Sequence, residues 1–397
     1  MKTLIARSIL PLAVLLAGAV HGGDVQARHA HDPGYHVATL PDIGGTSSAG
    51  ASINNRGWIA GSSNLADDAA VEATLWRNGR LTRLGTLGGA NSAVLWPVKN
   101  LRGIVTGIAQ TSEPDPYNEK WSCYYFFPGA QRRGLRCVGF KWENGVMTPL
   151  PTLGGTHGFA TGSNNWGQVV GWAENTVHDP SCVLPQVLQF RAVVWGPGHH
   201  QVRELPPLLE FGDSVSSATA INDRGQVVGI SGACSNAVGG TSARHNVLWE
   251  NGRATNIGDF GGIAWNTPMA INQRGDIVGF ANASQADGEN FNPRAFVKFR
   301  GQKIRNLGTL PGDVNSQATG INEWRQVVGQ SCDAAGNCRA FLWHDGAMTD
   351  LNTVRNGYGN VLVAANDIDD FGRITGQAFD AGANKSVAFS ASPYAHH

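Results

Sequence analysis

Several features that mark other protein classes are scarce or absent in this sequence. Only 15% of its 397 residues are charged, and thirty basic residues balance thirty acidic ones. This balance argues against a surface for nucleic acid and against a polybasic membrane patch. One apolar run, residues 9–20, is too short to span a bilayer, and no second such run follows. No later segment repeats apolar residues with the 3.6-residue period of a helix, so few helices are expected.

Sequence motifs that carry chemistry are also missing. The chain has no nucleophile elbow, no nucleotide-binding motif and no pair of cysteines at the two-residue spacing of a zinc site. The glycine-rich loops at 86–89 and 152–155 are not followed by a helix pattern, so they lack the geometry that binds phosphate. The sequence therefore predicts no metal ion, no cofactor and no nucleic-acid partner, and it does not favour an enzyme.

Glycine, by contrast, is abundant: there are 52, and some of them mark a repeat. Segments such as INDRGQVVG (221–229) and INQRGDIVG (271–279) are closely related. The glycine that ends each segment recurs seven times, every 46 to 64 residues, at Gly61, Gly107, Gly171, Gly229, Gly279, Gly329 and Gly376. Repetition at this interval indicates an architecture of stacked or circular units.

Each repeat reads as four short strands. Apolar runs are bounded by Asn-x-x-Gly or Asn-Gly turns, and a later run usually ends in Trp, as in NVLWENG (246–252). Units of four strands at this interval predict an all-β fold, a seven-bladed β-propeller of four-stranded antiparallel blades. The tryptophans recur at equivalent positions, which indicates packing between blades: Trp76, Trp142, Trp195, Trp249 and Trp343.

The two ends of the repeat region complement each other. Residues 34–45 resemble a lone fourth strand, and residues 384–391 resemble a lone third strand without its fourth. Their pairing would close the ring and remove exposed sheet edges. The predicted domains are a propeller at 34–391, a flexible segment at 28–33 before it and a disordered tail at 392–397 after it.

Residues 1–27 have the pattern of a secretory signal peptide. A basic start with Lys2 and Arg7 precedes the apolar run, and small residues allow cleavage after Ala19 or after Ala27. No cysteine for a lipid anchor follows closely. We expect a secreted or periplasmic monomer without membrane insertion.

Six cysteines in an exported chain favour disulfides. On the blade assignment, all six fall between second and third strands. Proximity then selects one pairing of the fifteen: Cys123–Cys137, Cys182–Cys234 and Cys332–Cys338. The second pair depends on the third and fourth blades being neighbours.

The repeat is similar to that of the extracellular HAF-repeat family. The resemblance rests on LGTLGG, INDRGQVVG and RAFLW-x-x-G-x-M-T-D-L, with RAF at 294–296 and 339–341, and it covers residues 34 to 391. It implies export and a β-propeller-like fold, and it implies no catalytic residue. Three departures from the pattern are interpreted as drift, namely Phe299 for the Trp, Arg325 for the turn Gly and Asp369 for the turn Asn.

The features that break the repeat give the candidate sites. The largest insertion, 111–137, carries aromatic and arginine side chains suited to stacking on sugars or gripping a protein, and Phe126 and Phe127 accompany them. Some of these rings also fit a second interpretation, in which they fill the loop's own small core. His157 and Trp265 have no counterparts in other blades, and both are expected in loops at the channel mouth, so they are added to the candidates. The predicted binding residues are Trp121, Tyr124, Tyr125, Arg132, Arg133, His157 and Trp265.

Two functional hypotheses follow from this set. In the first, the exported protein has no enzymatic activity and binds a glycan or an envelope or secreted protein through its insertion-bearing face. In the alternative it is a propeller polysaccharide lyase or glycoside hydrolase, with His157 as base, Arg132 or Arg133 neutralising a substrate carboxylate, and Asp213 as the acid. The spacing does not show that these residues converge.

Overall fold

The computed structural model describes residues 34–119, 123, 126–127, 134–198, 201–235 and 239–394. Its strands are β1 Tyr35–Thr39, β2 Gly44–Ile53, β3 Ile59–Leu65, β4 Val71–Arg77, β5 Arg80–Arg83, β6 Gly88–Ala93, β7 Val105–Pro114, β8 Leu135–Glu143, β9 Val146–Pro149, β10 Gly154–Ser163, β11 Val169–His178, β12 Leu188–Trp195, β13 Val202–Leu205 and β14 Val215–Ile221. They continue with β15 Val227–Gly232, β16 His245–Glu250, β17 Arg253–Asn256, β18 Thr267–Ile271, β19 Ile277–Ala281, β20 Arg294–Lys298, β21 Arg305–Gly308, β22 Asn315–Ile321, β23 Val327–Cys332, β24 Cys338–His344, β25 Ala347–Asp350, β26 Val361–Ile368, β27 Ile374–Asp380 and β28 Lys385–Pro393.

Helices are short in the described residues. They are α2 Gln285–Glu289, α3 Leu351–Val354 and two 3-10 turns, Leu209–Phe211 and Gly240–Ala243. None of them is long and apolar enough to cross a membrane. The prediction of an all-β chain with few helices is confirmed.

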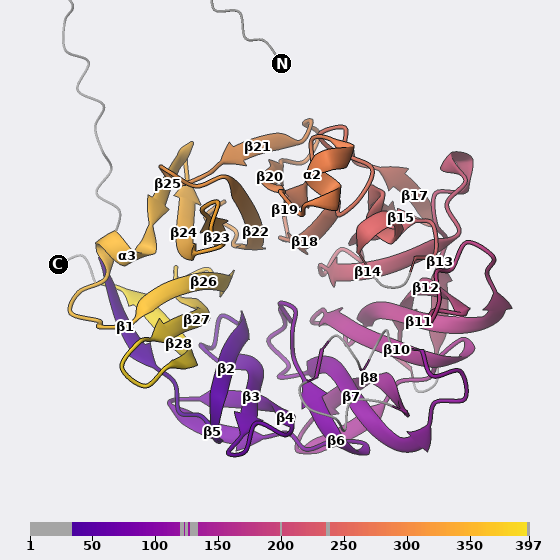
Figure 1. Ribbon diagram of the computed structural model, residues 1–397, viewed down its shortest axis with the longest axis horizontal. Coiled ribbons are helices and arrows are strands. Elements are labelled where there is room, and N and C mark those ends of the chain that lie inside the picture. The colour runs from indigo at the N-terminus through magenta and orange to yellow at the C-terminus, as the bar shows by residue number, and fades with distance from the viewer. Residues whose placement is uncertain are drawn as a thin grey trace, which may run out of the picture. The chain divides into compact units, whose positions relative to one another are not determined.

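Five sheets contain four antiparallel strands each, in the orders β6–β9, β10–β13, β14–β17, β18–β21 and β22–β25. A sixth sheet has eight strands and joins β2–β5 to β26–β28 and β1. Its two halves meet at one parallel pair, Ser47 with Ser386. The sheets stand around a common centre (Figure 1), so the fold is propeller-like and built from four-stranded antiparallel units as predicted.

The repeated glycine has a specific steric role. In all seven units a Cβ atom at this position would lie only 1.9–2.1 Å from a carbonyl oxygen of the first strand. For Gly229 that atom is the Ser217 oxygen, just before the register shifts between Ala218 and Ala220. The close approach of the two backbones at this bulge excludes every side chain, which explains why glycine marks the repeat.

Buried side chains fill the space between neighbouring sheets. One cluster combines Val278 of β19 with Ile321 of β22 and Phe341 of β24. The five repeated tryptophans are all buried. The Nε1 atoms of Trp76, Trp195 and Trp249 each donate to the carbonyl of a proline that precedes their own unit, over 2.8 Å. The indoles therefore belong to the core and are not a binding stripe.

Two boundaries differ from the prediction. Strand β28 continues to Pro393, two residues beyond the predicted limit, because Tyr35 of β1 pairs with that residue. Three cysteines lie within strands, Cys137 in β8, Cys332 in β23 and Cys338 in β24. Cys332 and Cys338 are direct cross-strand partners, so the hairpin extends through them.

Candidate functional site

The predicted site falls largely on a segment whose structure is not described. Trp121, Tyr124, Tyr125, Arg132 and Arg133 all lie outside the described residues. The parts of the insertion that are described, together with the neighbouring sheet β10–β13, define the candidate site.

Disulfides anchor this region. Cys123 bonds to Cys137 within the insertion, and Cys182 bonds to Cys234, which joins the β11–β12 and β15–β16 connections. The third bond joins Cys332 to Cys338. All three predicted pairings are confirmed, including the one that required neighbouring sheets.

His157 does not lie in a loop at a channel mouth. It is the fourth residue of β10, and none of its side-chain surface is exposed. The backbone N–H of Cys137 donates to its Nδ1 over 3.2 Å, and its Nε2 lies 3.2 Å from Asp115 Oδ2. An acceptor role for Nδ1 places the ring proton on Nε2, facing the carboxylate. Although burial opposes the charged form, the hydrogen bond from His157 holds the pKa of Asp115 below its usual value.

Two glutamates are buried beside this pair. Glu119 Oε1 accepts the N–H groups of Val187 and Leu188, each over 2.7 Å, and thereby ties the insertion to the β11–β12 connection and the start of β12. Glu174 on β11 accepts the N–H of His157 over 2.7 Å. Burial and the charge of Glu174 raise the pKa of Glu119 to about 7.

The same cluster contains a possible set of metal ligands. Asp115, Glu119 and His157 each present one ligand atom, and these atoms lie within 4.8 Å of one another. The Cys137 N–H, however, occupies Nδ1 and leaves the proton on Nε2, so the imidazole is not available as a neutral ligand through Nε2. The three residues therefore fit a hydrogen-bonded cluster better than a metal centre.

The outer surface of this region is apolar. Tyr117 is 42% exposed, Val177 49%, Val183 54% and Leu184 80%. Tyr117 packs edge-on against His178, with ring centroids 5.6 Å apart. A groove of about 350 Å³ lies alongside, lined by Pro114, Pro116, Tyr117, Arg136, Gly154, Gly155, Thr156, Thr176 and Leu188. The region thus exposes several large apolar side chains beside a cluster of buried carboxylates.

Asp213 and Trp265 have partners other than His157. Asp213 accepts hydrogen bonds from Ser231 Oγ over 2.7 Å and from His245 Nδ1 over 2.8 Å. Trp265 is half-buried, edge-on to Phe291 with ring centroids 5.0 Å apart. His245 was missed in the sequence because nothing local links it to Asp213, 32 residues away.

A second hollow lies where the turns between first and second strands meet. It has a volume of about 130 Å³, and its lining contains Asn54, Asn100, Asn272 and Asn322 from the repeated turns. The turn asparagines also connect sheets. Asn222 Nδ2 donates to the Asn272 carbonyl over 3.0 Å, and Asn272 Nδ2 donates to the Asn322 carbonyl over 3.1 Å. We call this hollow the turn mouth.

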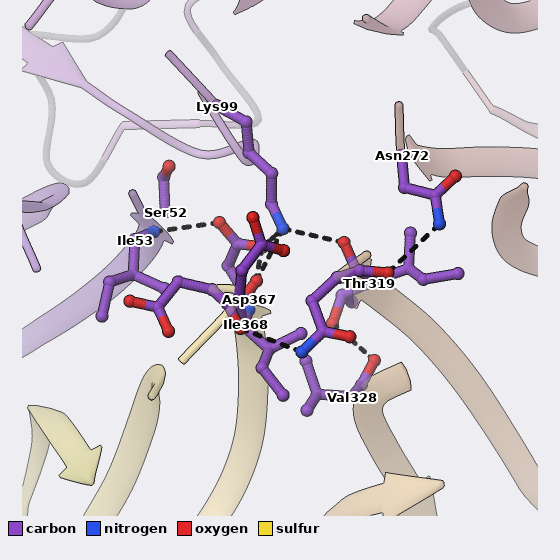
Figure 2. Close-up of polar contacts among 12 residues, drawn as sticks. Ser52, Ile53, Lys99, Asn272, Thr319, Val328, Asp367 and Ile368 are labelled. Atoms are coloured by element: carbon purple, nitrogen blue, oxygen red, sulfur yellow. Dashed lines mark hydrogen bonds and ion pairs between the residues drawn. The ribbon is translucent and has the colours of Figure 1, made fainter. Parts of the chain in front are cut away.

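Lys99 lines the turn mouth, and Figure 2 shows its ammonium beside Asp367. Its ammonium lies 2.9 Å from Asp367 Oδ1 and donates to the carbonyls of Ile321 and Ile368 over 2.8 and 2.6 Å. Asp367 is fully buried and also accepts the Ile53 N–H over 2.9 Å. Burial raises the pKa of Asp367, and the Lys99 charge opposes that rise. The positive charge of Lys99 is therefore neutralised within the protein.

No family model matches the sequence, and no curated protein does. Similar solved structures include Porphyromonas gingivalis dipeptidyl peptidase 4, with 7% identity and a TM-score of 0.38 over 89% of this chain and 59% of that one. Trypanosoma rangeli sialidase has 9% identity and a TM-score of 0.39 over 91% of this chain and 60% of that one. AofleA from Arthrobotrys oligospora has 10% identity and a TM-score of 0.34 over 80% and 89%. The chain spans about three fifths of the peptidase and the sialidase, and similarity at this level assigns no function.

Proposed function

We propose that this is an exported, non-enzymatic binding protein whose insertion-bearing face docks a protein partner. In this proposal the two halves of the eight-stranded sheet are separate blades, the β1–β28 pairing closes a ring of seven, and the chain belongs with the extracellular HAF-repeat proteins. The three disulfides support an oxidising compartment, outside the cytoplasm.

One observation carries the choice of a protein partner. Four large apolar side chains are exposed here: Tyr117 in the insertion, Val177 at the end of β11, and Val183 and Leu184 in the β11–β12 connection, which Glu119 ties to the insertion. Exposed apolar surface of this kind beside a groove is typical of sites that bury another protein's side chains. A glycan, the other occupant considered, would require more hydrogen-bonding groups than these side chains offer.

The hydrolase or lyase alternative has no comparable support. A general base must come within hydrogen-bond reach of the substrate. His157 is fully buried and has both ring nitrogens directed at protein groups, and Asp213 interacts with His245 instead.

Site-specific photo-crosslinking tests the proposal. A photoreactive amino acid at position 117 or 184 should capture one protein from the envelope and culture medium, and a probe at Ile263, which is about as exposed as Tyr117, should not. Excess unlabelled protein should compete, whereas a Tyr117→Ala, Leu184→Ser variant should not. A glycan captured at position 117 in place of a protein, or labelling that the variant competes as well as the unmodified protein does, would contradict the proposal.

A further inference from the structure

A second surface, at the turn mouth, has chemistry unlike that of the insertion face. Within each turn, the residue two places after the repeated Asn (or Asp369) is Arg56, Arg102, Trp166, Arg224, Arg274, Trp324 or Phe371. Three of these side chains are aromatic, and all three are largely exposed.

The two tryptophans share one arrangement. Trp166 Nε1 donates to the Asp223 carbonyl over 2.7 Å, and Trp324 Nε1 donates to the Asp370 carbonyl over 2.9 Å. Each bond reaches the next sheet along the chain. The indoles remain 64% and 63% exposed. Because the only polar atom of each ring is already satisfied, what the ring offers to solvent is an apolar face in a fixed orientation.

The floor of the turn mouth is rich in hydrogen-bond acceptors. Asp223, Glu323 and Asp370 line it, together with Asn55, Asn165 and Gln273. The Asp223 and Asp370 residues whose carbonyls bind the indoles belong to this lining, so the aromatic faces adjoin the polar floor. The one lysine in the lining, Lys99, is paired with Asp367. The floor therefore favours hydroxyl groups over an anionic ligand.

The spacing of the rings favours an extended ligand. Trp166 lies between β10 and β11, and Trp324 lies between β22 and β23. Two whole sheets, β14–β17 and β18–β21, separate them along the chain, and the two tryptophan-bearing sheets lie on opposite sides of the centre (Figure 1). Rings that flank an opening in this way do not enclose a small cation.

We infer that the turn mouth binds a neutral oligosaccharide, whose sugar rings stack on Trp166 and Trp324 and whose hydroxyl groups donate to the carboxylates and amides between them. This site lies apart from the insertion groove and does not rest on the proposed function. Apolar sugar faces suit exposed indoles, and a preorganised ring orientation lowers the entropic cost of binding.

The test uses the full-length mature protein and a panel of neutral oligosaccharides with uronic-acid oligosaccharides beside them. Titration calorimetry should show binding of a neutral member and no binding of the acidic ones. Trp166→Ala and Trp324→Ala should each weaken that binding roughly tenfold. Trp166→Phe keeps a stacking face but lacks the bond to Asp223, so its loss should be smaller.

Tyr117→Ala and Ile263→Ser serve as matched controls with exposed side chains elsewhere, and they should bind as the unmodified protein does. Circular dichroism should show that all variants fold. Three results would overturn the inference: no neutral oligosaccharide binds, only acidic ones bind, or the alanine variants bind with unchanged affinity. A failure to crosslink a protein at position 117 would contradict the proposed function but would not change oligosaccharide binding at the turn mouth. The two proposals can therefore be refuted independently.

Discussion

Asn55 and Asp370, 315 positions apart in the chain, exchange two hydrogen bonds. Asn55 Nδ2 donates to Asp370 Oδ2 over 2.6 Å, and the Asp370 backbone N–H donates to Asn55 Oδ1 over 3.0 Å. A hydrogen bond like that from the Asp370 N–H recurs around the turn mouth, and the donor is each time the residue that follows the turn Asn (or Asp369). Its backbone N–H donates to the side chain of the equivalent residue in the next sheet, as Asp223 does to Gln273 and Glu323 does to Asp370.

One position interrupts this circle. Leu101 stands where the other units have a polar residue, and its side chain cannot accept the Asn55 N–H. Asn55→Leu should lower the free energy of unfolding by roughly 1–3 kcal/mol, because it removes two of the hydrogen bonds that join the first and last repeats. Leu101→Asn should raise it by about 1 kcal/mol by supplying the missing acceptor.

Urea unfolding of the two variants and the unmodified protein measures both effects. Hydrogen exchange should also be faster in β1 and β28 of the Asn55→Leu variant, since β28 pairs with both β1 and β2. Unchanged exchange there would show that this contact does not support closure.

Glu119 makes the anchoring of the insertion depend on pH. Its pKa is about 7 in the folded protein and 4.5 as a free side chain. A carboxyl whose folded pKa lies above its unfolded value stabilises the fold most when protonated. The contribution is complete below about pH 4.5 and is lost as the pH rises through about 7. After allowance for partial solvent screening, the loss should be on the order of 1–2 kcal/mol.

Glu119→Gln is the matched variant, because the amide keeps the oxygen that accepts the Val187 and Leu188 N–H groups. Thermal unfolding between pH 5 and 8 should show a smaller decline in stability for this variant than for the unmodified protein. Parallel pH curves for the two proteins would exclude Glu119 as the titrating group.

Features that depend on local sequence patterns and on the repeat could be predicted, whereas contacts between side chains of distant segments could not. The strand units and the two disulfides of short span were predictable because turns, alternating apolar residues and close cysteines act locally, and the Cys182–Cys234 bond was predictable because the repeat makes consecutive units neighbours. The burial of His157 was not, because it depends on the Cys137 N–H and on carboxylates from the insertion. Lys99 likewise gains its role only when the turn between β6 and β7 meets β22 and β26.

Lys99 should be essential to stability through Asp367. Lys99→Met leaves a fully buried carboxylate without its cation and should cost roughly 3–5 kcal/mol at neutral pH. Asp367→Asn in the same chain should recover much of this loss, because it removes the charge that needs a partner. Urea unfolding of the two single variants and the double variant measures the coupling energy, and a value near zero would show that the pair is not a stabilising contact.

Two departures from the repeat, first interpreted as drift, compensate for each other. Arg325 occupies the glycine position of its turn with φ of 64°, a conformation that disfavours a side chain. Its guanidinium lies 4.3 Å from the ring of Phe299, which replaces the tryptophan of the preceding unit. Its Nε donates to Asp276 Oδ2 over 2.8 Å, and Asp276 is fully buried. The strained arginine is retained because a buried acid and an aromatic ring both depend on it.

Arg325→Gly should therefore destabilise the protein, although it restores the usual turn residue. Relief of the positive φ contributes about 1 kcal/mol, and the loss of the partner of Asp276 costs roughly 3 kcal/mol, which leaves a net loss of about 2 kcal/mol. Adding Asp276→Gln recreates the contact between the two preceding units, where the side chain of Gln226 lies against Gly275 of the next unit, and should bring stability back to at least that of the unmodified protein. Denaturant unfolding at neutral pH gives all three values. A more stable Arg325→Gly single variant would show that turn strain outweighs the ion pair.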